Sequence, residues 1–161
     1  MTETRTESRP PIPVGMAIGQ AVGRAQSVMS RQLASVCAEI GASLETYLAL
    51  QRLALLGDEA GREVYARDLS DSLALDLWSA GELANGLVAD GLVTLTGGMI
   101  RLAAAGVELR TRIAGTIGNI TAPLYAQLDP ADIETMVRTL QRLTTLVMES
   151  SAAPSAATGG R

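Results

Sequence analysis

Few residue types in this chain could carry out catalysis. It contains no histidine and a single cysteine, Cys37. Without an imidazole, no Ser–His or Cys–His nucleophile can form, and a zinc or non-haem iron site would lack its usual ligands. Tyr65, Glu63 and Asp68 could in principle exchange protons, but exposed acids on a short helix are usually solvated. We therefore expect no metal and no cofactor, and we recognise no catalytic motif.

Cys37 has two interpretations. It could be a redox sensor, which requires an accessible thiol with a lowered pKa. It lies, however, on the apolar side of a predicted helix, close to Met29 and Leu33, and no cation adjoins it in the sequence. We expect a small, buried apolar side chain instead.

The composition is that of a single globular domain. The chain has 161 residues, of which 47% are apolar, and it lacks phenylalanine, so the predicted core is aliphatic. No apolar run of about 18 residues could span a membrane, and residues 1–13 lack the apolar segment of a signal peptide. A single cysteine fits a reducing compartment. We expect a soluble, cytoplasmic protein that does not bind membranes.

The ends of the chain differ from its centre. Prolines at positions 10, 11 and 13 exclude a helix there, so residues 1–13 are predicted to be a disordered arm. Residues 151–161 have the composition of a disordered tail. Between these ends, apolar residues recur every three or four positions, which predicts a mainly α-helical fold. The first helix should end at Gly41, and Ser43 should cap the second.

A β-hairpin interrupts the predicted helices. Two short β-prone runs flank Gly97-Gly98 within residues 91–102, which is a strong hairpin signal. A helix–turn–helix followed by a hairpin is a winged helix. The sequence predicts the elements around it in this order: a polar break at 57–61, helices over 64–75 and 76–90 with Asp76 capping the second, the hairpin, a helix from Ala103 that Pro123 should kink or end, and a last helix starting at Asp129-Pro130.

Three local patterns resemble the MarR family of bacterial transcriptional regulators. The leucine spacing from Leu69 into Asp90-Gly91-Leu92-Val93 is similar to the family's helix–turn–helix running into its wing. Residues 101–106, with Leu102 and Gly106, resemble its strand-to-helix junction. Residues 128–130, followed by a leucine stripe, resemble the start of its final dimerisation helix. The resemblance covers residues 16 to 149.

The resemblance implies a homodimer that binds DNA and a small aromatic or apolar effector. Residues 14–150 would form one winged-helix domain, with a DNA-binding lobe at 57–102 and dimerisation helices at 14–56 and 103–150. The helix at 76–89 would face the major groove and the wing the minor groove. The residues expected to face DNA are Asp76, Trp78, Ser79, Glu82, Asn85, Thr94, Thr96, Arg67 and Arg101.

A ligand pocket is predicted between the long helices and the lobe. Such a pocket needs a mostly apolar wall with a few polar groups. The residues expected to line it are Met29, Leu33, Cys37, Tyr47, Gln51, Arg110 and Ile113.

The expected DNA lobe is unusually acidic. Residues 57–102 hold three arginines and eight acids, a net charge of −5, whereas the whole chain has −4. The helix at 76–89 has neither Arg nor Lys, and Leu77 and Trp78 stand near its start. We expect Trp78 to be half-buried under the wing, although it could also be an exposed stacking or partner-binding anchor. Because phosphate contacts supply much of DNA affinity, we expect weak DNA binding.

Two other functions remain open at this point. The chain could be a relative that has lost DNA binding and uses the inherited pocket to bind a ligand or to catalyse a biosynthetic reaction. It could also be a protein-interaction module that uses Leu77 and Trp78 as its contact surface.

Overall fold

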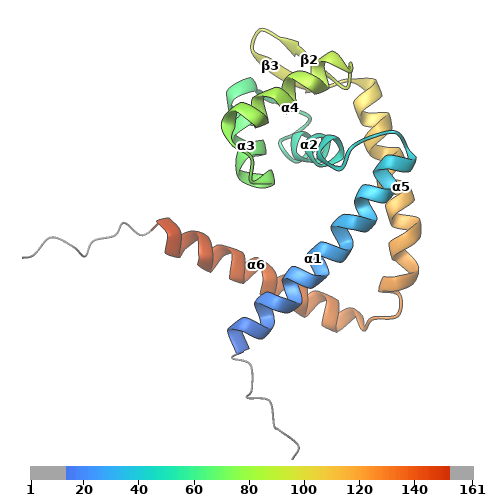
Figure 1. Cartoon of the computed structure of the whole chain (residues 1–161), viewed down its shortest axis with the longest axis vertical. Helices are drawn as coiled ribbons and strands as arrows, with labels where there is room; N and C mark the ends of the chain where they lie inside the picture. Colours follow the sequence, from blue (N-terminus) through green and yellow to red (C-terminus); the bar gives the residue numbers. More distant parts are fainter. Residues whose placement is uncertain (1–13, 153–161) are drawn as a thin grey trace, which may run out of the picture. The chain divides into compact units, whose positions relative to one another are not determined.

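The computed structural model describes residues 14–152 (Figure 1). The predicted arm at 1–13 and residues 153–161 of the predicted tail lie outside this range. The tail prediction was too long by two residues, because the last helix continues to Ala152. The elements, in chain order, are α1 (Val14–Glu39), α2 (Leu44–Leu55), β1 (Glu59–Gly61), α3 (Arg62–Leu73), α4 (Leu77–Ala89), β2 (Val93–Thr96), β3 (Met99–Leu102), α5 (Ala104–Tyr125) and α6 (Pro130–Ala152).

Side-chain caps set the start of three helices, as their residue types predict. The Ser43 hydroxyl accepts a hydrogen bond from the Thr46 amide at 3.0 Å at the start of α2. Asp76 caps α4 in the same way. At α6, the Asp129 carboxylate accepts from the Ala131 amide at 2.8 Å, and proline occupies the first helical position.

The wing is a three-stranded antiparallel sheet in the order β1-β3-β2. β2 and β3 form the predicted hairpin, and Gly97 and Gly98 both have positive φ in its turn, which favours glycine. β1 corrects the prediction of a polar break at 57–61. Three residues are too few to show strand periodicity, and β1 exists because its backbone pairs with β3.

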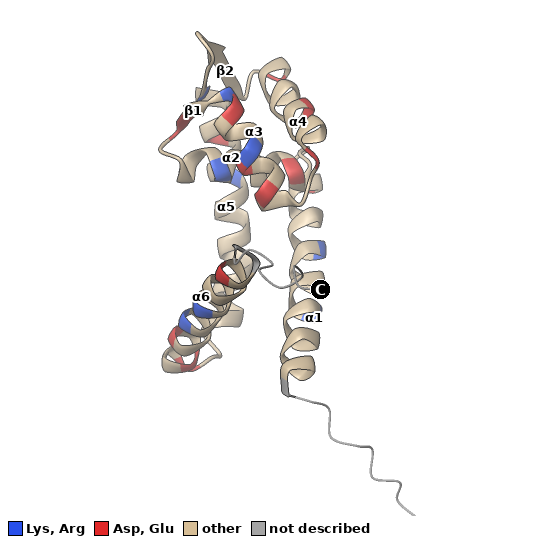
Figure 2. Ribbon diagram, turned by 90° about the vertical axis from the view of Figure 1, so that its left-hand side faces the viewer, with Lys and Arg blue, Asp and Glu red and all other residues tan. Residues whose placement is uncertain are grey.

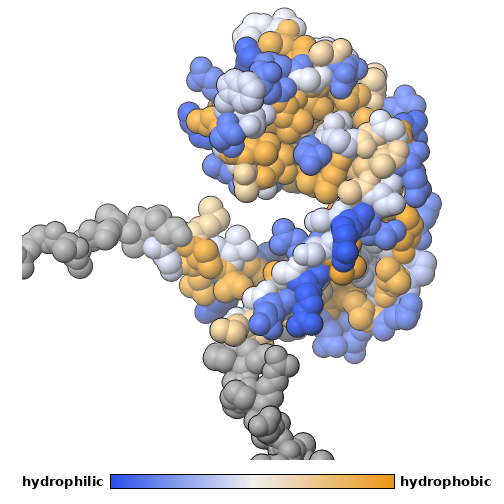
Figure 3. All heavy atoms as spheres, in the orientation of Figure 1, coloured by the Kyte–Doolittle hydropathy of each residue, from blue (hydrophilic) through white to orange (hydrophobic). Residues whose placement is uncertain are grey.

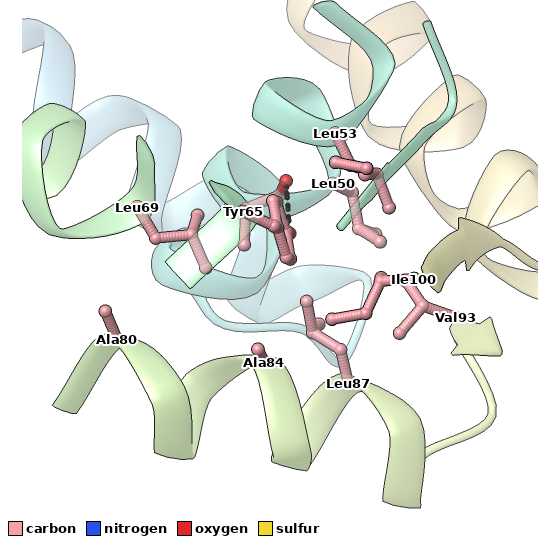
Figure 4. Close-up of a cluster of buried hydrophobic side chains, with 11 residues drawn as sticks. Leu50, Leu53, Tyr65, Leu69, Ala80, Ala84, Leu87, Val93 and Ile100 are labelled. Carbon is pink, nitrogen blue, oxygen red and sulfur yellow. Dashed lines mark hydrogen bonds between the residues drawn. The ribbon is translucent and has the colours of Figure 1, made fainter. Parts of the chain in front are cut away.

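One apolar core joins the wing to the helices of the lobe (Figure 4). Tyr65 is fully buried in it, and its hydroxyl donates a hydrogen bond to the Ala49 carbonyl at 2.8 Å. This bond satisfies the polar end of an otherwise apolar side chain. The core residues drawn and labelled with Tyr65 come from α2, α3, α4 and the two hairpin strands: Leu50, Leu53, Leu69, Ala80, Ala84, Leu87, Val93 and Ile100.

The chain divides into two compact units, with the division inside α5 after Ile117. The second unit contains the end of α5 and all of α6. α5 ends at Tyr125, two residues after Pro123, in agreement with the predicted stop. α6 carries a row of exposed large apolar side chains, part of which is visible as orange spheres in Figure 3: Met136, Val137, Leu140, Leu143 and Val147.

No single helix among residues 14–152 has the length and hydropathy of a membrane span, and only α1 and α2 taken together, with a 98° bend between them, reach that composition.

Candidate functional site

The first turn of α4 already holds a carboxylate. Asp76 accepts two hydrogen bonds from Ser79, from its amide at 2.9 Å and from its hydroxyl at 2.6 Å. These bonds lower the pKa of Asp76, the side-chain bond contributing most. The amides at a helix N-terminus attract anions, and here the protein supplies the anion itself.

The middle of α4 carries a polar network instead of a free DNA-reading surface. Asn85 donates from its amide to Glu82 at 3.1 Å, and its amide oxygen accepts from Nη2 of Arg62 on α3 at 2.8 Å. The Arg62 backbone amide also donates to the Gly98 carbonyl in the wing turn at 2.9 Å. Arg62 therefore connects α3, α4 and the wing.

The solvent face of the wing presents Arg101 between two neighbours. Arg101 on β3 pairs in register with Thr94 on β2 and with Glu59 on β1. Glu59 forms an ion pair with Arg101 Nε at 2.6 Å, and both side chains are about half exposed. Thr94 and Thr96 are exposed. Arg101 thus reaches solvent already paired with an acid.

The remaining lobe arginine, Arg67, is exposed and forms no ion pair within residues 14–152. Asp68 beside it accepts two hydrogen bonds from Arg52 of α2, at 2.6 and 2.9 Å. This two-point geometry fixes α2 against α3. Figure 2 shows acidic positions on both α3 and α4 and no basic position on α4.

Trp78 is not half-buried under the wing, and that expectation was wrong. Its exposed fraction is 76%, and that of Leu77 is 59%. Both side chains lie in the first turn of α4, whose buried positions are Ala80, Ala84 and Leu87. Because the helix turns 100° per residue, Trp78 falls on the side opposite the buried residues. Leu77 lies on nearly the same side as Ala84, but it is the first residue of the helix and is exposed there.

Three of the predicted pocket residues come together in a second apolar cluster. Cys37 of α1, Tyr47 of α2 and Ile113 of α5 are all buried in it. Gln51 donates to the Tyr47 hydroxyl at 2.7 Å. Burial, and to a smaller extent the charge of Glu45, raises the pKa of Cys37, so its thiol behaves as the small apolar side chain that the sequence predicts.

Met29, Leu33 and Arg110, which were also predicted to line the pocket, lie outside this buried cluster. Leu33 is partly buried and Met29 is 49% exposed, and neither belongs to it. Arg110 lies one helical turn before Ile113 on α5. Its Nε is shielded from solvent and has no hydrogen-bond partner among the described residues. An unsatisfied guanidinium nitrogen is costly unless something binds to it.

The possible proton-exchange group gains no support from the geometry. Tyr65 is buried and bonded to Ala49, and burial raises its pKa well above the usual value, with a smaller contribution from Asp68. Asp68 is bound to Arg52. Glu63 is exposed on the same helix. These three residues are therefore structural or solvated.

Sequence analysis missed the ion pairs and hydrogen bonds that organise the lobe. It did not single out Glu59 because it did not predict β1. It included Arg62 only in the count of three lobe arginines, and it did not pair Arg52 with Asp68, which lies on the next helix. No local pattern marks such contacts, because sheet register and helix packing create them.

The arrangement of α3, α4 and the hairpin defines a winged-helix protein. The sequence matches no protein-family model and no curated protein. Solved structures nevertheless match most of the chain, and they show a MarR-like winged-helix fold. At their low sequence identities, this likeness establishes the fold alone.

Three of these structures illustrate the match. The organohalide-sensing transcriptional regulator RdhR-CbdbA1625, in its ligand-free form, is 13% identical with a TM-score of 0.74, covering 99% of this chain and 98% of that one. A MarR family protein from Bacillus stearothermophilus is 15% identical with a TM-score of 0.68, covering 83% and 94%. Sco5413, a MarR family regulator from Streptomyces coelicolor, is 18% identical with a TM-score of 0.63, covering 83% and 94%.

Proposed function

We propose that this chain is a dimeric, MarR-like transcriptional regulator that binds DNA weakly and responds to a small aromatic effector. The observation that carries the proposal is a complete helix–turn–helix and wing attached to long terminal helices, a fold shared with MarR family transcriptional regulators. In this reading α4 enters the major groove and the wing lies over the minor groove.

Dimerisation is supported by the exposed apolar row of α6. A monomer would leave Met136, Leu140 and Leu143 in water along one helix face, and burying such a face against a second copy is favourable. Sedimentation should therefore give about twice the 16.7 kDa chain mass. Leu140→Arg should yield a monomer, whereas Gln141→Arg, on a different face of the helix, should leave the dimer intact. A monomeric wild type would refute this part of the proposal.

An acidic aromatic effector fits the surroundings of Arg110. Its buried, unsatisfied Nε lies one turn from Ile113, which packs with Tyr47 and Cys37. A phenolate or carboxylate could satisfy that nitrogen while its ring contacts the apolar cluster. The same regulator RdhR-CbdbA1625 has also been solved in a 2,4-dichlorophenol-bound form, again with this fold.

The effector proposal can be tested with 2,4-dichlorophenol by isothermal titration calorimetry. We expect saturable binding to the wild type and a loss of at least tenfold in Arg110→Leu. Arg112→Leu is the matched control, because Arg112 is exposed on the same helix and donates only a long bond to the Ile40 carbonyl. Equal losses in both variants would contradict a specific role for Arg110.

DNA binding is best tested by fluorescence anisotropy with the DNA upstream of the chain's own gene. We expect binding at low salt that weakens only gradually as salt rises, because few phosphates are neutralised. Absence of binding at the lowest salt would refute the regulator and leave a ligand-binding protein as the function of the fold.

A further inference from the structure

The acids of the wing and of α4 are bonded to groups that a DNA phosphate would otherwise contact. Glu59 holds Arg101, Glu82 holds the Asn85 amide, and Asp76 occupies the first turn of α4. We propose that Glu59 is an internal competitor of DNA phosphate for Arg101, and that it sets the affinity and salt dependence of the lobe for polyanions. For DNA as the polyanion, this inference rests on the proposed function.

The backbone fixes Glu59 beside Arg101. β1 is paired with β3 along its three residues, with Glu59 directly opposite Arg101. Just before β1, the Leu102 amide donates to the Asp58 carbonyl at 2.9 Å, and just after it the Arg62 amide donates to the Gly98 carbonyl at 2.9 Å. The strand is therefore held at both ends, and the carboxylate does not depend on a mobile loop for its position.

The pair is nevertheless accessible enough to open. The Arg101 side chain is 61% exposed and that of Glu59 is 48% exposed. Exposed ion pairs are weak, so a phosphate can displace Glu59 at a cost of about two- to fivefold in affinity per subunit. Wherever Glu59 instead stays on Arg101, this arginine neutralises no phosphate. The net release of ions is then close to zero for this contact.

Removing the Glu59 carboxylate should allow Arg101 to contribute fully to the binding of polyanions. Glu59→Gln keeps the size of the side chain and its place in the strand. Each freed arginine should steepen the slope of log affinity against log salt by about 0.9. Glu63→Gln is the matched control, because Glu63 is exposed in the same lobe, changes the net charge equally and forms no ion pair within residues 14–152.

The first measurement uses heparin as a generic polyanion, so that it does not depend on an operator sequence. We expect the Glu59→Gln full-length protein to elute from heparin at clearly higher salt than both the wild type and Glu63→Gln. In an Arg101→Gln background, Glu59→Gln should add no more than Glu63→Gln does. Circular dichroism melting curves check that all variants are folded.

The second measurement repeats the series by DNA anisotropy at several salt concentrations. We expect Glu59→Gln to bind two- to fivefold more tightly per subunit, with the steeper slope. Equal shifts for Glu59→Gln and Glu63→Gln on heparin would overturn the inference, since net charge alone would explain them. A heparin shift specific to Glu59→Gln without any DNA binding would support the competitor and refute the regulator.

Discussion

Gly106 is the position where one added methyl group should disturb the wing most. It is buried near the start of α5, and a Cβ there would lie 2.1 Å from the Leu92 carbonyl oxygen and 3.3 Å from Leu102 Cδ2. The Leu92 oxygen also accepts the Ala103 amide at 3.1 Å. The obstacle is backbone just before β2, so it cannot rotate away as a flexible side chain would.

The expected cost of Gly106→Ala follows from two opposing terms. Overpacking against a fixed neighbour costs up to about 3 kcal/mol in the free energy of unfolding. Alanine in place of glycine inside a helix returns about 1 kcal/mol. The net destabilisation should be about 2 kcal/mol, and it should be accompanied by a shift of the wing relative to α5.

Gly115→Ala provides the matched control in the same helix. Nothing lies within 4 Å of a Cβ at Gly115, so only the helix-propensity gain of up to about 1 kcal/mol applies. Urea unfolding followed by circular dichroism measures both variants. If Gly106→Ala were as stable as Gly115→Ala, the close approach of α5 to Leu92 would not exist in solution, and our account of this junction would be wrong.

Three further predictions concern single interactions. Arg52→Leu leaves the mostly buried Asp68 without its two hydrogen bonds, so urea unfolding should show a loss of roughly 1–2 kcal/mol, whereas Arg67→Leu should show little change. The pKa of Asp76 is lowered below its ordinary value of 3.8 in the folded state, so this carboxylate stabilises the fold above that pH, and the benefit disappears as the pH falls through the lower folded pKa. The stability curves of the wild type and Asp76→Asn should therefore differ at pH 7 and converge as the solution is acidified below pH 3.8. Because burial raises the pKa of Cys37, Ellman's reagent at pH 8 should modify the native protein at least about tenfold more slowly than the protein unfolded in guanidinium, and equal rates would show that the thiol is accessible.

Local sequence signals were sufficient for the helices and the hairpin. Ser43 and Asp76 cap helices because their side-chain oxygens reach the next free amides, a property of the residue and its near neighbours. Gly97-Gly98 turns the hairpin because both positions need positive φ. β1 could not be found in this way, since its strand character comes from pairing with β3 much later in the chain.

Helical periodicity predicted several members of the buried cluster, but it did not predict which side chains bind one another. Cys37, Tyr47 and Ile113 share a buried cluster, in line with helical periodicity, whereas Met29 stays exposed because no described element covers it. Trp78 was misplaced because a large aromatic side chain is usually at least partly buried, and the small residues on the core side of α4 already fill the available space.

The ion pairs and hydrogen bonds of the lobe arginines and acids determine how much of its charge can act on DNA. The value of −5 for residues 57–102 overstates the repulsion of DNA, because Arg52 from outside that range neutralises Asp68. The count of three arginines, in turn, overstates the attraction available to phosphates, because Arg101 is held by Glu59 and Arg62 is bonded to Asn85. Arg67 is then the one lobe arginine that meets solvent without a partner among residues 14–152. A DNA complex of this protein would therefore depend on neutral donors such as the threonines of the wing, and on the duplication of every contact by a second subunit. Neutral donors release no counterions, so weak salt dependence is the measurable consequence of this arrangement.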